Sequence, residues 1–498
     1  MKAQICTFAY MAAAGAVFLA WGACALAGVD DVKVTTDTSI DCSSIQSIAR
    51  DLYKNYKSDQ EKAIATWYFV RRMHFHWPHI PTWNSIDLIN SYGFALCGHQ
   101  STMLCQIANA GGLKARTMHL PGHVIAEINY DGAWHMFDCQ VGWYALNRKG
   151  KVASCAEMKA DPTLVTDAVK EGRDSKPYFQ CRDNPRGGTN YAAAAKAGRI
   201  VPPPTDRLIV NLRRGESITR VWGNEDKAWF PSKDDRGFVS PRHTCTGRDI
   251  DANDPANWPY WKPYAKGGVK RYYGNGRMVY QPNLATEAFT EGLAKAGMDG
   301  ASAKYKDGKG PNLHPAAAGK PGTVTFVIDS PYVAVDAWLD AEALRKTEKD
   351  VLAVHARTAD RGDWKEIYRA DKTGQIKLAK LSLKEAAWAA HRYLVKFELA
   401  AGADVSDVGV DSLKITTVFV NNMYALPYFT PGKNTIKLTA AEGTDLNKSK
   451  LTLEYAWEEQ GKEKTLTKTI DKLPFETTVT VGGEELPRMK QVKLSVAP

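Results

Sequence analysis

The chain has 498 residues, too many for a single hydrophobic core, and a prior of about 100–200 residues per domain predicts about three or four domains. Apolar residues make up 44% and charged residues 24% of the chain, which is typical of globular proteins and excludes a disordered one. The formal charge of +10 is spread along the sequence without a long basic run, so we expect weak attraction to anionic surfaces and no nucleic-acid partner.

The N-terminus has the pattern of a secretory signal. Lys2 precedes a mostly apolar run over residues 5–26, and Ala25-Leu26-Ala27 provides a small-residue cleavage site. We expect residues 1–27 to be removed and the mature protein to be secreted or periplasmic. A membrane anchor made by the same run and a lipid attached to Cys24 are the alternatives. No later segment reaches about 20 apolar residues, so no transmembrane segment is expected in the mature chain.

The mature chain would keep an odd number of cysteines. Removal of the leader leaves Cys42, Cys97, Cys105, Cys139, Cys155, Cys181 and Cys245. In an exported protein an even set can form disulfides, and one thiol is then left over for another role. The sequence alone does not fix the pairing.

Two helices are predicted before residue 115. Ser58 and Glu61 fit a capping box that opens a helix ending near Arg72. A second helix should begin at Cys97, after a loop over residues 92–96, and stop at Gly111-Gly112.

A β-hairpin is predicted around Asp131-Gly132, which is a strong two-residue turn signal between strand patterns. The turn fixes the register, so that Ile125 opposes Asp138. His123 and Asp138 then lie on one face as diagonal neighbours, whereas His135 projects from the opposite face.

The chain is expected to be multidomain. An α+β domain at 28–180 is followed by an irregular β-rich region at 181–320, a β-sandwich of jelly-roll type at 321–442 and a small β unit at 443–498. The strand candidates in the last two units are residues 324–328, 333–338, 351–355, 393–399, 413–420, 435–438, 451–457, 477–481 and 492–496.

Cys97 is the candidate nucleophile. A helix N-terminus lowers the pKa of a thiol because its unpaired amides and its dipole favour the thiolate. The backbone amide of Cys97 would supply half of an oxyanion hole. His123 and Asp138 complete a set in which a carboxylate holds an imidazole and the imidazole meets the thiol.

In this order and on these elements, the three residues resemble the transglutaminase-like superfamily of papain-like thiol enzymes. The matching segments are Gly93-Phe-Ala-Leu-Cys97-Gly-His-Gln-Ser, Gly112-Leu-Lys-Ala-Arg116, His123-Val-Ile-Ala-Glu-Ile and Trp134-His-Met-Phe-Asp138. The resemblance covers about residues 45–145. It implies that Cys97 is the nucleophile, His123 the acid and base, and Asp138 the residue that orients it. It also implies a thioester acyl-enzyme that water or an amine resolves, with no cofactor.

Other side chains could line the same pocket or bind a metal. The pocket candidates are Trp77, Tyr92, His99 and His119. The cluster His74, His76 and His79 has the short spacing of zinc ligands, but no local carboxylate or thiolate completes it. A solvated loop or an aromatic wall beside Cys97 is the preferred interpretation of this cluster.

The leading hypothesis is an exported cysteine-dependent amide hydrolase or acyltransferase acting on a peptide, protein or peptidoglycan-type amide. The alternative is a non-catalytic surface- or glycan-binding protein that uses the transglutaminase-like domain as a scaffold. Tryptophan and tyrosine rings in the C-terminal half could contact glycans, although a β-sandwich core explains them equally well.

Overall fold

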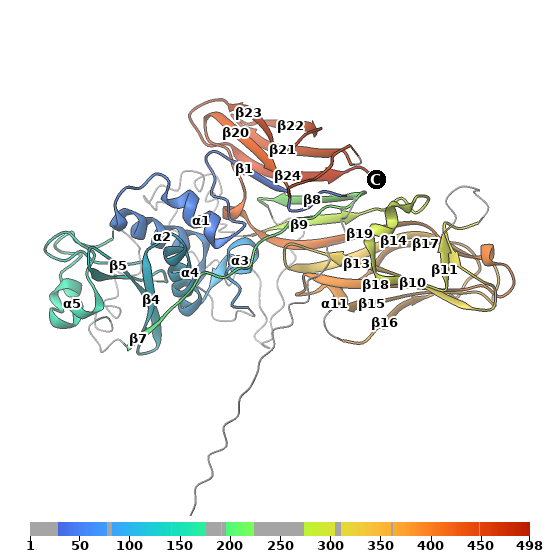
Figure 1. Cartoon of the computed structure of the whole chain (residues 1–498), viewed down its shortest axis with the longest axis horizontal. Helices are drawn as coiled ribbons and strands as arrows, with labels where there is room; N and C mark the ends of the chain where they lie inside the picture. The colour runs from blue at the N-terminus through green and yellow to red at the C-terminus, as the bar shows by residue number, and fades with distance from the viewer. Residues whose placement is uncertain are drawn as a thin grey trace, which may run out of the picture.

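The computed structural model describes residues 28–76, 82–140, 142–175, 191, 196–223, 273–303, 310–359, 362–447 and 449–498. Within these ranges the protein is multidomain and mainly β, with several antiparallel sheets (Figure 1). None of the helices in the described ranges is both long and apolar enough to span a membrane. The predicted leader at residues 1–27 lies outside the described residues.

The N-terminal part is built around a four-stranded antiparallel sheet in the order β6-β5-β4-β7. Its strands are β4 (Lys114–Leu120), β5 (His123–Tyr130), β6 (Ala133–Phe137) and β7 (Lys196–Ile200). Its helices are α1 (Ile45–Tyr53), α2 (Asp59–Met73), α3 (Ser85–Asp87), α4 (Cys97–Ala110), α5 (Cys155–Ala160) and α6 (Thr163–Thr166). Apolar residues of α1, α2 and α4 form a core with one face of the sheet, and α5 and α6 cover the other.

Both predicted helices are confirmed. Ser58 and Glu61 form the expected reciprocal capping box of α2. Helix α4 begins at Cys97 and ends before Gly111, where a Cβ atom would lie 2.0 Å from the ring of Tyr53. A glycine therefore both ends the helix and lets α1 approach it closely.

The segment before Cys97 is more ordered than the loop predicted over residues 92–96. A π-helical turn, η1 (Leu88–Tyr92), leads into Gly93, whose φ of 64° is left-handed. The short strand β3 (Phe94–Ala95) then pairs in parallel with β2 (Phe75–His76). These backbone hydrogen bonds fix the position at which α4 starts.

The C-terminal half contains two sheets that share one apolar core. One sheet has the order β10-β13-β18-β15-β16, and the facing layer contains β17, β14 and β19. Their bounds are β10 (Leu293–Asp299), β13 (Pro321–Asp329), β14 (Ala334–Arg345), β15 (Val351–Thr358), β16 (Lys365–Arg369), β17 (Gly374–Ser382), β18 (Arg392–Ala400) and β19 (Val408–Asn422). Short helices η3 (Glu287–Gly292), α11 (Lys384–Ala387), η4 (Val405–Asp407) and η5 (Met423–Ala425) lie between strands.

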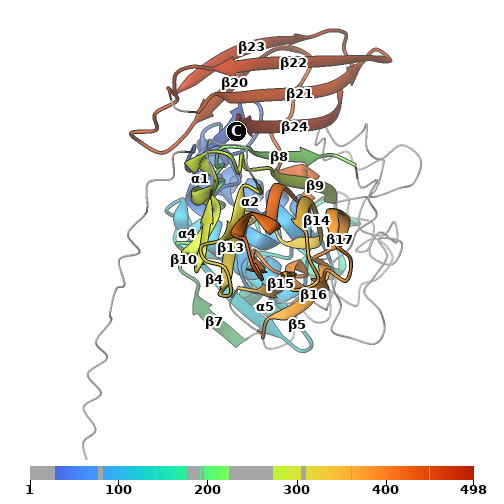
Figure 2. The same ribbon diagram turned by 90° about the vertical axis from the view of Figure 1, so that its right-hand side faces the viewer.

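The layer with β19 continues into the C-terminal strands as one ten-stranded sheet, in the order β11-β12-β19-β9-β8-β24-β21-β22 with β14 and β17 beside it. A second layer, β1-β20-β23, lies with these C-terminal strands above the rest of the protein (Figure 2). The bounds are β1 (Lys33–Thr36), β8 (Glu216–Val221), β9 (Tyr273–Tyr280), β11 (Ala301–Ala303), β12 (Leu313–Pro315), β20 (Gly432–Thr439), β21 (Leu451–Glu459), β22 (Lys462–Ile470), β23 (Phe475–Val481) and β24 (Arg488–Val496). Each of the nine strand candidates beyond residue 320 overlaps an observed strand, whereas β16, β17 and β22 were not predicted.

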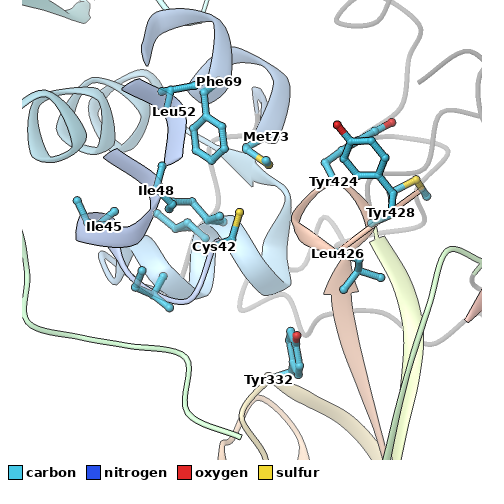
Figure 3. Close-up of a cluster of buried hydrophobic side chains, with 14 of the residues drawn as sticks. Cys42, Ile45, Ile48, Leu52, Phe69, Met73, Tyr332, Tyr424, Leu426 and Tyr428 are labelled. Carbon is cyan, nitrogen blue, oxygen red and sulfur yellow. The ribbon is translucent and has the colours of Figure 1, made fainter. Parts of the chain in front are cut away.

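The helical part and the β part are joined by a continuous apolar core. Aromatic residues of the β part, including Tyr332 and Tyr424, lie opposite Phe69 and Met73 of α2 (Figure 3). The buried Asn422 adds hydrogen bonds from its side-chain nitrogen to the carbonyls of Met73 and Ile89, at 3.1 and 2.7 Å. Buried polar groups with such partners fix one relative position of the two parts.

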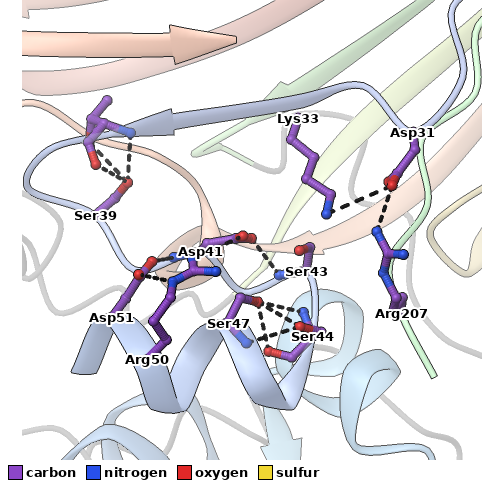
Figure 4. Close-up of polar contacts among 11 residues, drawn as sticks. Asp31, Lys33, Ser39, Asp41, Ser43, Ser44, Ser47, Arg50, Asp51 and Arg207 are labelled. Atoms are coloured by element: carbon purple, nitrogen blue, oxygen red, sulfur yellow. Dashed lines mark hydrogen bonds and ion pairs between the residues drawn. The ribbon is translucent and has the colours of Figure 1, made fainter. Parts of the chain in front are cut away.

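Polar contacts also fasten the N-terminal segment. Asp31 lies between Lys33 and Arg207, at 3.8 and 2.5 Å, and Arg50 pairs with Asp51 at 2.8 Å (Figure 4). Strand β1 pairs antiparallel with β20, so the start of the described chain belongs to a sheet made by its C-terminal strands.

Candidate active site

Cys97 is the first residue of α4. The first helical hydrogen bond runs from the amide of Gln100 to the carbonyl of Leu96 at 3.0 Å, so the amides of residues 97–99 precede the helical ladder. Burial raises the pKa of the Cys97 thiol, but hydrogen bonds from His123 and from the Val124 amide, with the His123 charge, lower it by more. The net effect is a pKa below the ordinary value for cysteine.

His123 is the first residue of β5, and its Nε2 lies 2.7 Å from Oδ2 of Asp138. Burial alone would lower the pKa of His123, but the charge and hydrogen bond of Asp138, followed by those of Cys97, raise it to about 10. The imidazole is therefore protonated at neutral pH, when the Cys97 pKa favours the thiolate. The three side chains form a thiolate–imidazolium–carboxylate arrangement.

The predicted hairpin register is confirmed. Ala126 pairs with Phe137 and Tyr130 with Ala133, with Asp131 and Gly132 in the left-handed turn. His135 stacks on Tyr130 with ring centroids 3.7 Å apart, and its Nδ1 hydrogen-bonds the carbonyl of Val152. It does not take part in the arrangement around Cys97.

Asp138 is enclosed by aromatic side chains that the sequence did not point to. Its side chain is 1% exposed, and its carbonyl accepts a hydrogen bond from Nε1 of Trp67 at 2.8 Å. The hydroxyl of Tyr191 donates to Oδ2 at 2.6 Å, and the Tyr191 ring stacks on Trp143 at 4.9 Å. Two backbone hydrogen bonds, of 2.9 and 3.0 Å, join Asp138 to Trp143. These contacts hold the carboxylate at the end of β6.

Trp83 is another residue near Cys97 that sequence reasoning missed. Its ring stacks on His99 with centroids 3.8 Å apart, and a Cβ atom at Gly98 would lie 3.5 Å from it. The Trp83 residue is 65% exposed, whereas His99 is buried, and burial lowers the pKa of His99 to about 4. The start of α4 therefore carries an exposed indole supported by a neutral imidazole.

The remaining predicted pocket residues are spread out. Tyr92 is buried and packs edge-on against Phe94. His119 is exposed on β4 and opposes Val124, so it projects from the other side of the sheet from His123. Trp77 lies outside the described residues.

The proposed histidine cluster is only partly described. His74 is fully buried, its Nδ1 lies 3.2 Å from the carbonyl of Val70, and burial lowers its pKa to about 4. His79 and the side chain of His76 lie outside the described residues. Among the residues that the structure describes, no group of histidine, cysteine or carboxylate side chains has a geometry for a metal ion.

The other described cysteines differ from Cys97 in their surroundings. Cys42, Cys105, Cys139 and Cys155 are buried, and burial raises the pKa of each thiol. All five cysteines in the described ranges are free thiols, so the expectation of disulfides is not met among them. Cys181 and Cys245 lie outside these ranges. Cys97 is the described cysteine whose thiol pKa is lowered.

Comparisons with known proteins do not identify the chain. No model of a protein family matches it, and no curated protein matches it. A weak similarity joins it to the solved structure of the pilus backbone RrgB from Streptococcus pneumoniae, with 14% identity, coverage of 41% of this chain and 84% of that chain, and a TM-score of 0.09. A score this low carries no argument about fold or function.

Proposed function

We propose that the protein is a cysteine-dependent amide hydrolase or acyltransferase that works through a Cys97 thioester. One observation carries the proposal: the Cys97 thiol, with its lowered pKa, is hydrogen-bonded to His123, whose Nε2 lies 2.7 Å from Asp138. Perturbed pKa values in such an arrangement are typical of nucleophilic sites.

The chemistry follows from the protonation states. The Cys97 thiolate attacks the carbonyl carbon of an amide, and the amides at the start of α4 are available to stabilise the oxygen that becomes negative. The His123 imidazolium gives its proton to the leaving nitrogen, and the C–N bond breaks. Neutral His123 then takes a proton from water or an amine, which attacks the thioester and releases the thiol.

The finer fold assignments belong to the same proposal. A transglutaminase-like fold for residues 28–180 is supported by the helix that starts at Cys97 and by the adjacent hairpin. A jelly-roll for residues 321–442 is supported by two sheets around one core. Export by the N-terminal segment and a peptide, protein or peptidoglycan-type amide substrate complete it.

The test is iodoacetamide labelling at mildly acidic pH, located by mass spectrometry, together with turnover of peptide amides. Cys97→Ala should abolish the preferential label and the turnover while the far-UV circular dichroism spectrum stays unchanged. Cys155→Ala is the matched control, because it removes a thiol whose pKa is raised, and it should keep both. Equal labelling of Cys97→Ala and the unmodified chain would contradict the proposal. Strong glycan binding with no Cys97-dependent reaction would favour the non-catalytic alternative.

A further inference from the structure

Two donors share one oxygen of Asp138. Oδ2 accepts from Nε2 of His123 at 2.7 Å and from the hydroxyl of Tyr191 at 2.6 Å. Tyr191 lies 53 residues beyond Asp138 in the chain and belongs to neither strand of the hairpin. The function proposed above uses His123 and Asp138 but gives Tyr191 no part.

The surroundings fix the direction of the Tyr191 hydroxyl. The tyrosine is 2% exposed and its ring lies nearly parallel to that of Trp143, at an angle of 14°. Trp143 is itself joined to Asp138 through both of their backbone amides. The hydroxyl and the carboxylate are thus held on one local unit, which is costly to rearrange because both groups are buried.

We propose that Tyr191 is a positioning residue that sets how readily His123 gives up its proton, an inference that rests on the proposed function. A hydrogen bond to an ionised carboxylate stabilises the charge and reduces its pull on other protons. With two donors on Oδ2, Asp138 orients the imidazolium without holding its proton as tightly as a carboxylate with one donor would.

The consequence is confined to one step. When the bond between Cys97 Sγ and the carbonyl carbon has formed and the C–N bond breaks, His123 must pass its proton to the leaving nitrogen. A stronger hold on that proton slows this transfer. An ester whose leaving group departs as a stable anion, such as p-nitrophenolate, needs no proton and is insensitive to the change.

Tyr191→Phe tests the inference, because it removes the hydroxyl and keeps the ring on Trp143. Turnover of a peptide amide should fall about tenfold, while acylation by a p-nitrophenyl ester should stay within about twofold. In the pH profile of iodoacetamide alkylation of Cys97, the alkaline step that marks loss of the His123 proton should move to higher pH.

Tyr130→Phe is the matched control, since it removes a buried hydroxyl that contacts Gln60 at 3.4 Å and not the site. It should change none of the three measurements. An equal fall for amide and ester, or an alkaline step that stays in place, overturns the role of Tyr191. If the unmodified chain turns over neither substrate, the proposed function fails, and the alkylation profile still decides the effect of Tyr191 on His123.

Discussion

Replacing Asp138 with asparagine should remove most of the special reactivity of Cys97. The pKa of His123 is raised from 6.5 to about 10 against the effect of burial, and Asp138 is the main cause of the rise. Because a tenfold change in proton affinity is about 1.4 kcal/mol, this rise corresponds to about 4–5 kcal/mol of attraction. Two charges about 4 Å apart at an effective dielectric constant of about 20 attract by about 4 kcal/mol, which agrees with that value.

Asparagine keeps the shape of the side chain and an oxygen for His123 and Tyr191, so the perturbation is chiefly the loss of charge. Burial then lowers the pKa of His123 below 6.5, and at pH 6 the thiolate form of Cys97 loses its imidazolium partner. The rate of alkylation by iodoacetamide at pH 6 should fall roughly a hundredfold to a thousandfold.

The assay is a time course of alkylation at Cys97 from pH 5 to 8, followed by mass spectrometry. Asp131→Asn is the matched control, because it also removes one carboxylate from the hairpin, at an exposed turn with φ of 50° that asparagine tolerates. The control should follow the unmodified chain. A rate for Asp138→Asn within threefold of the unmodified chain would refute the electrostatic reasoning.

Two further predictions concern the same region. In a Cys97→Ala chain, the raised pKa of His123 stabilises the fold fully below pH 6.5 and less as pH rises through its folded value, so the difference in melting temperature from Cys97→Ala/Asp138→Asn should shrink from pH 6 to 10; a difference that grows with pH would contradict it. If the exposed Trp83 contacts the substrate, Trp83→Ala should raise KM about tenfold with little change in kcat, whereas Trp388→Ala, an exposed indole on the β part, should change neither; an unchanged KM for Trp83→Ala would exclude that contact.

The parts of the site that the sequence predicts are those with short-range causes. The capping box at Ser58, the helix between Cys97 and Gly111, and the hairpin register around Asp131 each depend on residues within one turn or one ladder. Given these elements, His123 and Asp138 must lie near each other. Their approach to Cys97 required the further expectation that the hairpin packs beside the helix, which the resemblance supplied.

The enclosing residues could not be found in this way. Trp67 comes from α2 and Tyr191 from a segment far beyond the hairpin, and no periodic pattern links either to Asp138. A buried carboxylate needs hydrogen-bond partners, so their existence follows from physical chemistry. Their identity depends on tertiary packing.

The same limit applies to the larger architecture, and it bears on the site. Amphipathic patterns marked nine C-terminal strands, but not the pairing of β1 with β20, because strand pairing across the whole chain has no local signal. Nor did they indicate that Asn422, at the end of β19, would bond the carbonyls of Met73 and Ile89. Those carbonyls belong to the segments that lead to β2 and β3, and β3 immediately precedes Cys97. The β part therefore supports the backbone that places the nucleophile, which is why the helical part should not be tested in isolation.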